Sequence, residues 1–278
     1  MSKITPITSD NLELETLLFE RDEATNGAVA IITINRPEAA NALNDAMTKD
    51  LFKVAIACDE DPTIRAVILT GSGDKLFCAG GDLKVFAEAG EHGSALIKEM
   101  VTFLHGAIAR FARMGKPVIA AVNGNAGGAG VSLTAMADLA IAADNVTFTM
   151  AYTRAGLTPD GSSTYFLARA VGLRRAYDMA LTNRPVPAKQ AEAWGLVNYL
   201  VPAEALKDEA LKLARQLAMG PTNVFAMTKA LLVDSSVTSL ETQMEHEAQA
   251  IASAVTAEDG KEGISAFLEK RMPNYTGR

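Results

Sequence analysis

The sequence predicts an α/β fold, with helices crossing between the strands of a sheet, followed by a helical C-terminal region. Residues 65–70 (RAVILT) and 117–122 (PVIAAV) form near-continuous apolar runs, which are typical of strands buried on both faces. Apolar residues at helical spacing lie between the two runs, so strand and helix alternate along the chain. After Pro159 the pattern is almost entirely helical.

Local signals predict the other elements in order. Short apolar, β-branched runs predict strands at 14–20 and 28–34. Asn44 is expected to cap the helix that follows, and helical spacing predicts a second helix at 95–114. The later elements are expected as strands at 138–142, 146–150 and 197–201, and as helices at 131–137, at 202–218, from Pro221 onward, at 239–255 and at 261–270.

These elements divide the chain into a core at 1–200 and a helical C-terminal region at 201–278. A chain of 278 residues is long enough for one large domain with an appendage. The C-terminal region lacks a complete hydrophobic core of its own. We therefore expect it to pack on the first region or on another subunit.

Composition excludes several classes of protein. The chain has 26 Lys and Arg against 33 Asp and Glu, a formal charge of −7, and no basic run, which argues against nucleic-acid binding. No apolar run approaches the roughly 18 residues that cross a bilayer. The first residues lack the apolar segment of a signal peptide, so a cytoplasmic protein without membrane association is expected.

Cysteine and histidine are too sparse for a disulfide framework or a metal centre. The only cysteines are Cys58 and Cys78, which cannot supply a four-thiolate zinc site. The three histidines are widely separated, so no metal is predicted. Cys78 has no nearby base in the sequence and is interpreted as a packing residue.

Two glycine-rich turns follow buried strands, at 77–83 (FCAGGDL) and at 123–130 (NGNAGGAG). Glycine permits close approach of another chain or a ligand, and a turn at a helix start leaves free N–H groups. Two such turns could direct two N–H donors at one oxygen and form an oxyanion hole. The alternative is that the turns only pack against each other, and spacing alone slightly favours it.

Other catalytic motifs are missing from the sequence. The second turn does not match G-x-G-x-x-G, and no phosphate-binding G-x-x-x-x-G-K-[ST] is present. A G-x-S-x-G elbow is missing too, which argues against a serine hydrolase.

Five segments, in a fixed order, extend over nearly the whole chain. They are 35–37 (NRP) with 41–44 (NALN), 77–83, 116–130 (KPVIAAVNGNAGGAG), 143–163 (ADNVTFTMAYTRAGLTPDGSS) and 258–275 (EDGKEGISAFLEKRMPNY). Together they resemble the crotonase (enoyl-CoA hydratase/isomerase) superfamily. The resemblance implies a spiral of ββα repeats with a helical C-terminal trimerisation region. It also implies a homotrimer or dimer of trimers, an acyl-CoA thioester substrate and no cofactor beyond the coenzyme A of that substrate.

The resemblance places the two oxyanion N–H groups on Gly81 and Ala129, within the two turns described above. The family's hydratases also carry two glutamates that activate water, and these positions fall on Ser132 and Tyr152. Neither residue can act as a carboxylate base, so hydration by that mechanism is not expected.

Asp160, in the sequence GLTPDG, resembles the single carboxylate of the family's 3-enoyl-CoA to 2-enoyl-CoA isomerases. One carboxylate suffices there, because it removes a proton at C2 and returns it at C4. The alternative is that Asp160 is a helix N-cap before Gly-Ser-Ser. Isomerisation with Asp160 as acid and base is the expected reaction.

A second resemblance is to the 4-chlorobenzoyl-CoA dehalogenases of the same superfamily. It places a nucleophilic aspartate on Asp160, an assisting histidine on His105, and the tryptophan that contacts the nucleophile on Tyr152. Tyrosine lacks the indole N–H, which weakens the match. The preferred interpretation of His105 is a partly buried helix residue with no chemical role.

The resemblance also implies substrate-binding roles for Ala79 in the first turn and for Lys84, Phe267 and Lys270 at the coenzyme A. The last two would often come from a neighbouring subunit. An exposed lysine without function is an equally good interpretation of Lys84 and of Lys270. Two further alternatives stay open: a hydratase with a different water-activating group, and a non-catalytic acyl-CoA-binding subunit.

Overall fold

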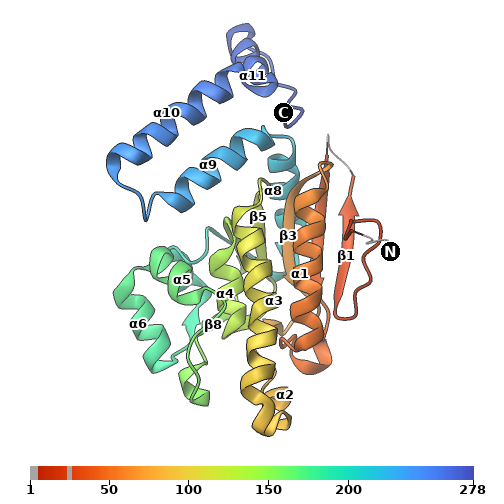
Figure 1. Cartoon of the computed structure of the whole chain (residues 1–278), viewed down its shortest axis with the longest axis vertical. Helices are drawn as coiled ribbons and strands as arrows, with labels where there is room; N and C mark the ends of the chain where they lie inside the picture. Colours follow the sequence, from red (N-terminus) through yellow and green to blue (C-terminus); the bar gives the residue numbers. More distant parts are fainter. Residues whose placement is uncertain (1–5, 24–26) are drawn as a thin grey trace, which may run out of the picture.

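The computed structural model describes residues 6–23 and 27–278 of the chain. Figure 1 shows an α/β body from which the last three helices project as an arm. The helices of the body are α1 (Asp45–Glu60), α2 (Leu83–Glu88), α3 (Gly93–Arg113), α4 (Ala129–Met136), α5 (Ser163–Val171), α6 (Leu173–Thr182), α7 (Ala188–Trp194) and α8 (Leu206–Ala218). The C-terminal arm consists of α9 (Thr222–Asp234), α10 (Leu240–Thr256) and α11 (Glu258–Glu269).

A six-stranded sheet forms the centre of the body, in the order β1-β2-β3-β5-β7-β10. Its first pair is antiparallel and its other neighbours are parallel. The strands are β1 (Leu17–Asp22), β2 (Ala28–Ile34), β3 (Ile64–Gly71), β5 (Val118–Val122), β7 (Leu139–Ala143) and β10 (Tyr199–Val201). The buried apolar runs of the sequence are thus the central strands β3 and β5.

A second sheet, in the order β4-β6-β8-β9, runs beside the first. Its strands are β4 (Leu76–Cys78), β6 (Asn125–Gly127), β8 (Thr147–Thr149) and β9 (Val186–Pro187). Successive chain turns place β3, β5 and β7 in the large sheet and β4, β6 and β8 in the small one. A helix follows each such pair, so the expected spiral of ββα repeats is confirmed.

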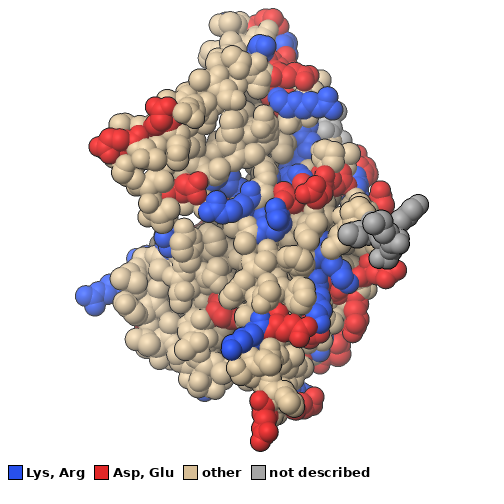
Figure 2. Space-filling model, viewed as in Figure 1, with Lys and Arg blue, Asp and Glu red and all other residues tan. Residues whose placement is uncertain are grey.

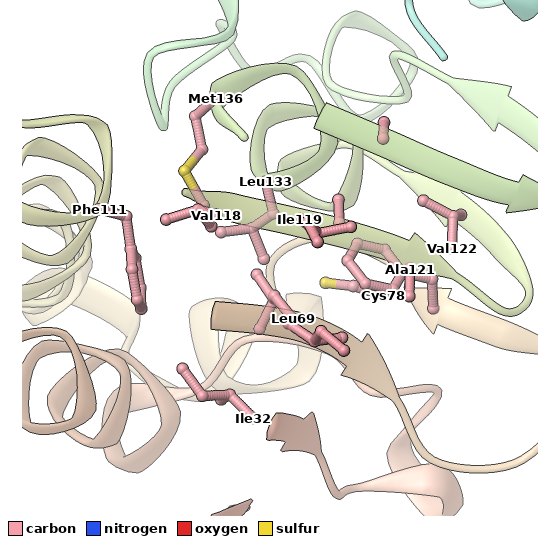
Figure 3. Packing of buried hydrophobic residues seen from close by; sticks show 14 of the residues in the cluster. Ile32, Leu69, Cys78, Phe111, Val118, Ile119, Ala121, Val122, Leu133 and Met136 are labelled. Carbon is pink, nitrogen blue, oxygen red and sulfur yellow. The ribbon is translucent and has the colours of Figure 1, made fainter. Parts of the chain in front are cut away.

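The core lies between the sheets and the helices that cover them. Figure 3 shows Leu69 of β3 and Ile119 of β5 among side chains from α3 and α4, with the Cys78 thiol in the same layer. Phe77 and Phe148, one from each of two strands of the small sheet, are completely buried. Burial raises the pKa of the Cys78 thiol to about 12, which agrees with a packing role.

The first strand begins later than the sequence predicts. The expected start was residue 14, but β1 pairs with β2 only from Leu17 onward. The amides of Glu15 and Thr16 instead donate to the Asp50 carboxylate of α1, each at 2.8 Å. A side chain from a distant helix therefore replaces the strand partner of these two amides.

Helix boundaries also differ from the predictions, mostly by a few residues. Asn44 caps α1 as expected, because its side chain accepts from the Met47 amide at 2.9 Å. The helix expected at 202–218 is a 3₁₀ turn at Ala203–Ala205 followed by α8. The last helix begins at Glu258 rather than at 261.

The helices of the C-terminal region at 201–278 are divided between the body and the arm. Helix α8 packs on β2, β3, β5 and β7 and buries Leu206, Ala210 and Ala214. The C-terminal arm extends beyond the body, with α10 packed on α9 and α11 (Figure 1). Partly buried Lys229 of α9 attaches the arm to the body through Asp138, with Nζ 2.7 Å from Oδ2.

Among the described residues, no helix is long and apolar enough to cross a bilayer. The described part of the chain also contains no group of three or more His, Cys, Asp or Glu that could hold a metal ion. Figure 2 shows acidic and basic side chains interspersed over one face of the molecule, with broad uncharged areas between them.

Candidate active site

A cavity of about 310 Å³ opens between the two glycine-rich turns, α3 and the segment at 151–160. Both turns reach it, because Gly81 and Ala129 are among its lining residues together with Ala79. Tyr152 and Asp160 line the same cavity. The structure therefore brings together five of the predicted site residues.

The turn after β4 leaves the Gly81 N–H outside the backbone pairing. Leu43 bridges this turn by donating its amide to the Gly80 carbonyl at 2.7 Å and accepting from the Asp82 amide at 2.9 Å. The bridge therefore uses the atoms on either side of Gly81 and not its N–H. Gly80 has φ of 103°, a conformation that favours glycine.

An ion pair between Arg36 and Asp82 holds the same turn in place. Arg36 Nη1 lies 3.2 Å from Asp82 Oδ2 and donates to the Ala42 carbonyl at 2.6 Å. The Asp82 carboxylate also accepts from the Lys84 amide at the start of α2. The arginine of the NRP segment and the aspartate of FCAGGDL are thus partners, a positioning role that the sequence reasoning did not assign.

The second turn places the Ala129 N–H at the start of α4. Gly128, with φ of 47°, precedes the helix, and Ala129 is its first residue, where an amide has no partner within the helix. A Cβ built on Gly80 would lie 3.3 Å from the Ala129 nitrogen. The two turns are therefore in contact, and the joint action of their amides on one ligand oxygen remains a prediction.

The Asp160 carboxylate accepts a hydrogen bond from a phenol. Tyr152 Oη donates to Asp160 Oδ1 at 2.7 Å. The Tyr152 ring also packs on the second turn, since a Cβ built on Gly128 would lie 3.8 Å from two of its carbons. Burial and the nearby Asp160 charge raise the pKa of the Tyr152 phenol, so it remains a donor at neutral pH.

Ser132, completely buried on α4, completes this cluster. Its Oγ lies 3.2 Å from Tyr152 Oη and donates to the Asp160 carbonyl oxygen at 3.1 Å. The hydroxyl of Ser163 donates to the same carbonyl at 2.9 Å. The two positions where hydratases of the family are expected to hold glutamates are therefore bonded to each other and to Asp160.

Asp160 does not cap the helix that follows it. The N-cap of α5 is Ser162, which has φ of 65° and makes no side-chain cap hydrogen bond. The Asp160 side chain instead turns toward Tyr152 and the cavity. The alternative role that the sequence left open, a helix cap, is therefore wrong.

His105 lies next to this site but does not line the cavity. It is exposed on α3, not partly buried as expected, and its Nε2 accepts from the Gly161 amide at 3.2 Å. This contact fixes the backbone beside Asp160. A nitrogen that accepts from an amide must present its lone pair to that amide, so the observed arrangement is structural.

Of the residues expected at the coenzyme A, Lys84 lies on α2, a helix that lines the cavity, whereas Phe267 and Lys270 lie elsewhere in the chain. Lys84 is exposed on α2, and only its backbone amide contacts Asp82. Phe267, which is 81% exposed, and Lys270 lie at the end of α11. In Figure 1 this helix and α2 lie at opposite ends of the molecule.

Comparison with known proteins agrees with this architecture. The family model described as enoyl-CoA hydratase/isomerase matches residues 24–278. The chain is 39% identical to 1,2-epoxyphenylacetyl-CoA isomerase of Escherichia coli (strain K12) over 252 residues, which cover 90% of this chain and 95% of that protein. It is 34% identical to 4-chlorobenzoyl coenzyme A dehalogenase-1 of Arthrobacter sp over 252 residues, 90% of each chain.

A solved structure shows the same fold. The crystal structure of enoyl-CoA hydratase from Mycobacterium smegmatis matches with a TM-score of 0.86 and 36% identity, and the match covers 94% of this chain and 99% of that one. The family match extends from β2 to the end of the chain and so includes both sheets apart from β1, the two glycine-rich turns and the C-terminal helices. The chain therefore belongs to the enoyl-CoA hydratase/isomerase family of acyl-CoA enzymes.

Proposed function

We propose that this enzyme isomerises 3-enoyl-CoA thioesters to 2-enoyl-CoA thioesters, with Asp160 as the acid and base. The observation that carries the proposal is that a single carboxylate, held by Tyr152, lines the same cavity as Gly81 and Ala129. One basic group and two amide donors are the parts that this reaction requires.

In the proposed mechanism the Gly81 and Ala129 amides bind the thioester oxygen. Asp160 removes a proton from C2, and the electron pair of that C–H bond moves into the thioester to give a dienolate. The two amides stabilise the negative charge on oxygen, which contributes about 3 kcal/mol per donor in a site without water. The protonated Asp160 then delivers the same proton to C4, which leaves the double bond between C2 and C3.

The cavity wall favours an uncharged acyl group. Apart from Asp160, its lining among the described residues contains no charged side chain. Its wall on the side of α2 and α3 is formed by Leu83, Phe86, Ile97, Met100, Val101 and Leu104. Burying an ionised group against such a wall is costly, so aliphatic or aromatic chains are the proposed substrates.

Nucleophilic attack by Asp160 on an activated aryl ring is the second candidate. The hydrogen bond from the Tyr152 hydroxyl to Asp160 supports this reaction, because Tyr152 occupies the position where the related dehalogenases are expected to have a tryptophan. The contact of His105 with the Gly161 amide counts against it, because that Nε2 lone pair is engaged and not available to a water molecule. Isomerisation needs no assisting base and is the better supported reaction.

We further propose that neighbouring copies in a trimer supply Phe267 and Lys270 to the coenzyme A. Both residues lie at the C-terminal end of α11, and in Figure 1 this helix lies at the opposite end of the molecule from α2, whose Leu83 and Phe86 line the cavity. The apolar residues Leu268 and Met272 are 74% and 87% exposed there, which suits an interface between copies.

The test compares the wild-type protein and Asp160→Asn on crotonyl-CoA, 3-hexenoyl-CoA and 4-chlorobenzoyl-CoA. The proposal expects turnover of 3-hexenoyl-CoA that falls by at least about a thousandfold in Asp160→Asn. Efficient hydration of crotonyl-CoA would indicate a hydratase, and chloride release from 4-chlorobenzoyl-CoA a dehalogenase. Thioester binding with no turnover of any of the three would indicate a non-catalytic subunit. Each of these three outcomes would overturn the proposal.

A further inference from the structure

We propose that Tyr152 and Ser132 are positioning residues that make one oxygen of Asp160, Oδ2, the atom that carries the proton from C2 to C4. The inference rests on the proposed isomerisation and concerns the hydrogen-bond cluster behind the carboxylate. Ser132, Tyr152 and Asp160 come from α4, from the segment after β8 and from the loop before α5. Their polar atoms meet within 2.7 to 3.2 Å.

The directions of these hydrogen bonds follow from the protons available. An ionised carboxylate accepts only, so Tyr152 uses its single proton to donate to Oδ1. The contact between Tyr152 Oη and Ser132 Oγ can then only have Ser132 as donor, although Ser132 also has the Asp160 carbonyl within 3.1 Å. In either choice the Tyr152 proton stays directed at Oδ1.

Gly161 explains why the cluster is closely packed. It has φ of 59°, and a Cβ built on it would lie 3.2 Å from Ser132 Cβ and 3.3 Å from Ser132 Oγ. The chain can therefore bend directly after Asp160 and bring its carbonyl onto the Ser132 hydroxyl. Two other donors, the Ser163 hydroxyl and the Ser163 amide, lie 2.9 and 3.1 Å from that carbonyl, which fixes the backbone of Asp160.

The chemical consequence concerns the second oxygen. With Oδ1 engaged by an O–H group, Oδ2 is the oxygen that takes the proton when the C2–H bond breaks. The protonated acid keeps Oδ1 as an acceptor, so Tyr152 need not move between the two steps. The same Oδ2–H bond then breaks as the C4–H bond forms, which returns the carboxylate to its ionised form. The proton is carried from C2 to C4 on one atom of a carboxyl group that is prevented from rotating.

Tyr152→Phe tests this role, because it removes the hydroxyl and retains the ring that packs on Gly128. With 3-hexenoyl-CoA, kcat is expected to fall by about 10- to 100-fold at nearly unchanged KM. Deuterium placed at C2 is expected to reach C4 at a fraction reduced by about twofold or more, since a rotating carboxyl group exchanges it with water.

Ser132→Ala provides a second test, because Ser132 acts through Tyr152. A fall in kcat of about threefold is expected, and the double variant should match Tyr152→Phe alone instead of showing the product of the two effects. Tyr177→Phe is the matched control, since this tyrosine is 55% exposed on α6. Its kcat and its deuterium transfer from C2 to C4 should equal those of the wild type.

Three outcomes separate this inference from the proposed function. Full activity of Asp160→Asn would remove the proposed function and this inference with it. Loss of activity in Asp160→Asn, together with wild-type kcat and wild-type deuterium transfer in Tyr152→Phe, would overturn the positioning role alone. Multiplicative effects of the Tyr152 and Ser132 substitutions on kcat would overturn the role of Ser132.

Discussion

A Cβ built on Gly127 would lie 2.8 Å from the carbonyl oxygen of Ala79, so the two glycine-rich turns meet without room for a methyl group. Gly127 belongs to β6 and Ala79 follows β4, and these strands are parallel neighbours in the small sheet. The relative position of the Gly81 and Ala129 amides therefore depends on the lack of a side chain at Gly127.

Gly127→Ala is expected to separate the turns. The strain should lower the free energy of unfolding by about 1–3 kcal/mol and reduce kcat on 3-hexenoyl-CoA by at least about tenfold, because the amide donors lose their alignment. Chemical denaturation and steady-state kinetics measure the two effects. Gly93→Ala is the control for stability, since a Cβ built on Gly93 meets nothing within 4 Å. Wild-type kinetics in Gly127→Ala would contradict the prediction.

Lys229→Met is expected to loosen the C-terminal arm. The Lys229 side chain is 10% exposed, and its ammonium contacts the Asp138 carboxylate at 2.7 Å and donates to the carbonyls of Phe111 and Lys116. Its removal leaves the two carbonyls without this donor and leaves the Asp138 carboxylate with the Val118 amide, so we expect a loss of about 1–3 kcal/mol in unfolding free energy. Lys212→Met, at an exposed i,i+3 pair with Glu209, should cost at most about 0.5 kcal/mol. Equal losses of unfolding free energy for Lys229→Met and Lys212→Met in urea denaturation would contradict this prediction.

Stability is expected to fall in acid partly through Asp61. Burial opposes ionisation of this group, but hydrogen bonds from Ser9 and Thr63 and the charge of Arg21 lower its pKa from 3.8 to about 2. Because the folded pKa lies below the unfolded value, the stabilisation is complete above 3.8 and is lost as the pH falls through about 2.

The variant Asp61→Asn should therefore be less stable than the wild type at neutral pH, and the difference should shrink between pH 4 and pH 2. The midpoints of urea unfolding of the two proteins, compared at several pH values in this range, measure the difference in stability. Asp74→Asn, at an exposed position between β3 and β4, is the control. A difference that stays constant with pH would show that Asp61 stabilises the fold without its charge.

A 3-enoyl-CoA substrate with a terminal carboxylate is expected to react poorly. The cavity lining, as far as the structure describes it, has no Lys, Arg or His to receive a second negative charge. We expect kcat/KM to be at least about a hundredfold lower than for 3-hexenoyl-CoA, through the cost of burying an unpaired ion. Comparable values for the two substrates would show that the acyl end remains in water.

Several features were predictable from local sequence. Strands β3 and β5 could be predicted without knowledge of their neighbouring strands, because strands that are buried on both faces consist almost entirely of apolar residues. The Asn44 cap and both glycine-rich turns follow equally local rules. The start of β1 did not, because the Asp50 carboxylate that replaces its strand partner lies on a helix 34 residues away from Thr16.

The sequence by itself determined the two turns, the lone acidic residue Asp160 and the missing carboxylates at Ser132 and Tyr152. Only the tertiary structure decided what these residues contact. It put β4 beside β6, so that the turns touch, and it folded Tyr152 back onto Asp160 around Gly156, whose φ is 72°. It also placed α11 far from the cavity. The physical reason is that strand pairing and chain reversal act between segments far apart, whereas propensity and motif act within a few residues of the chain.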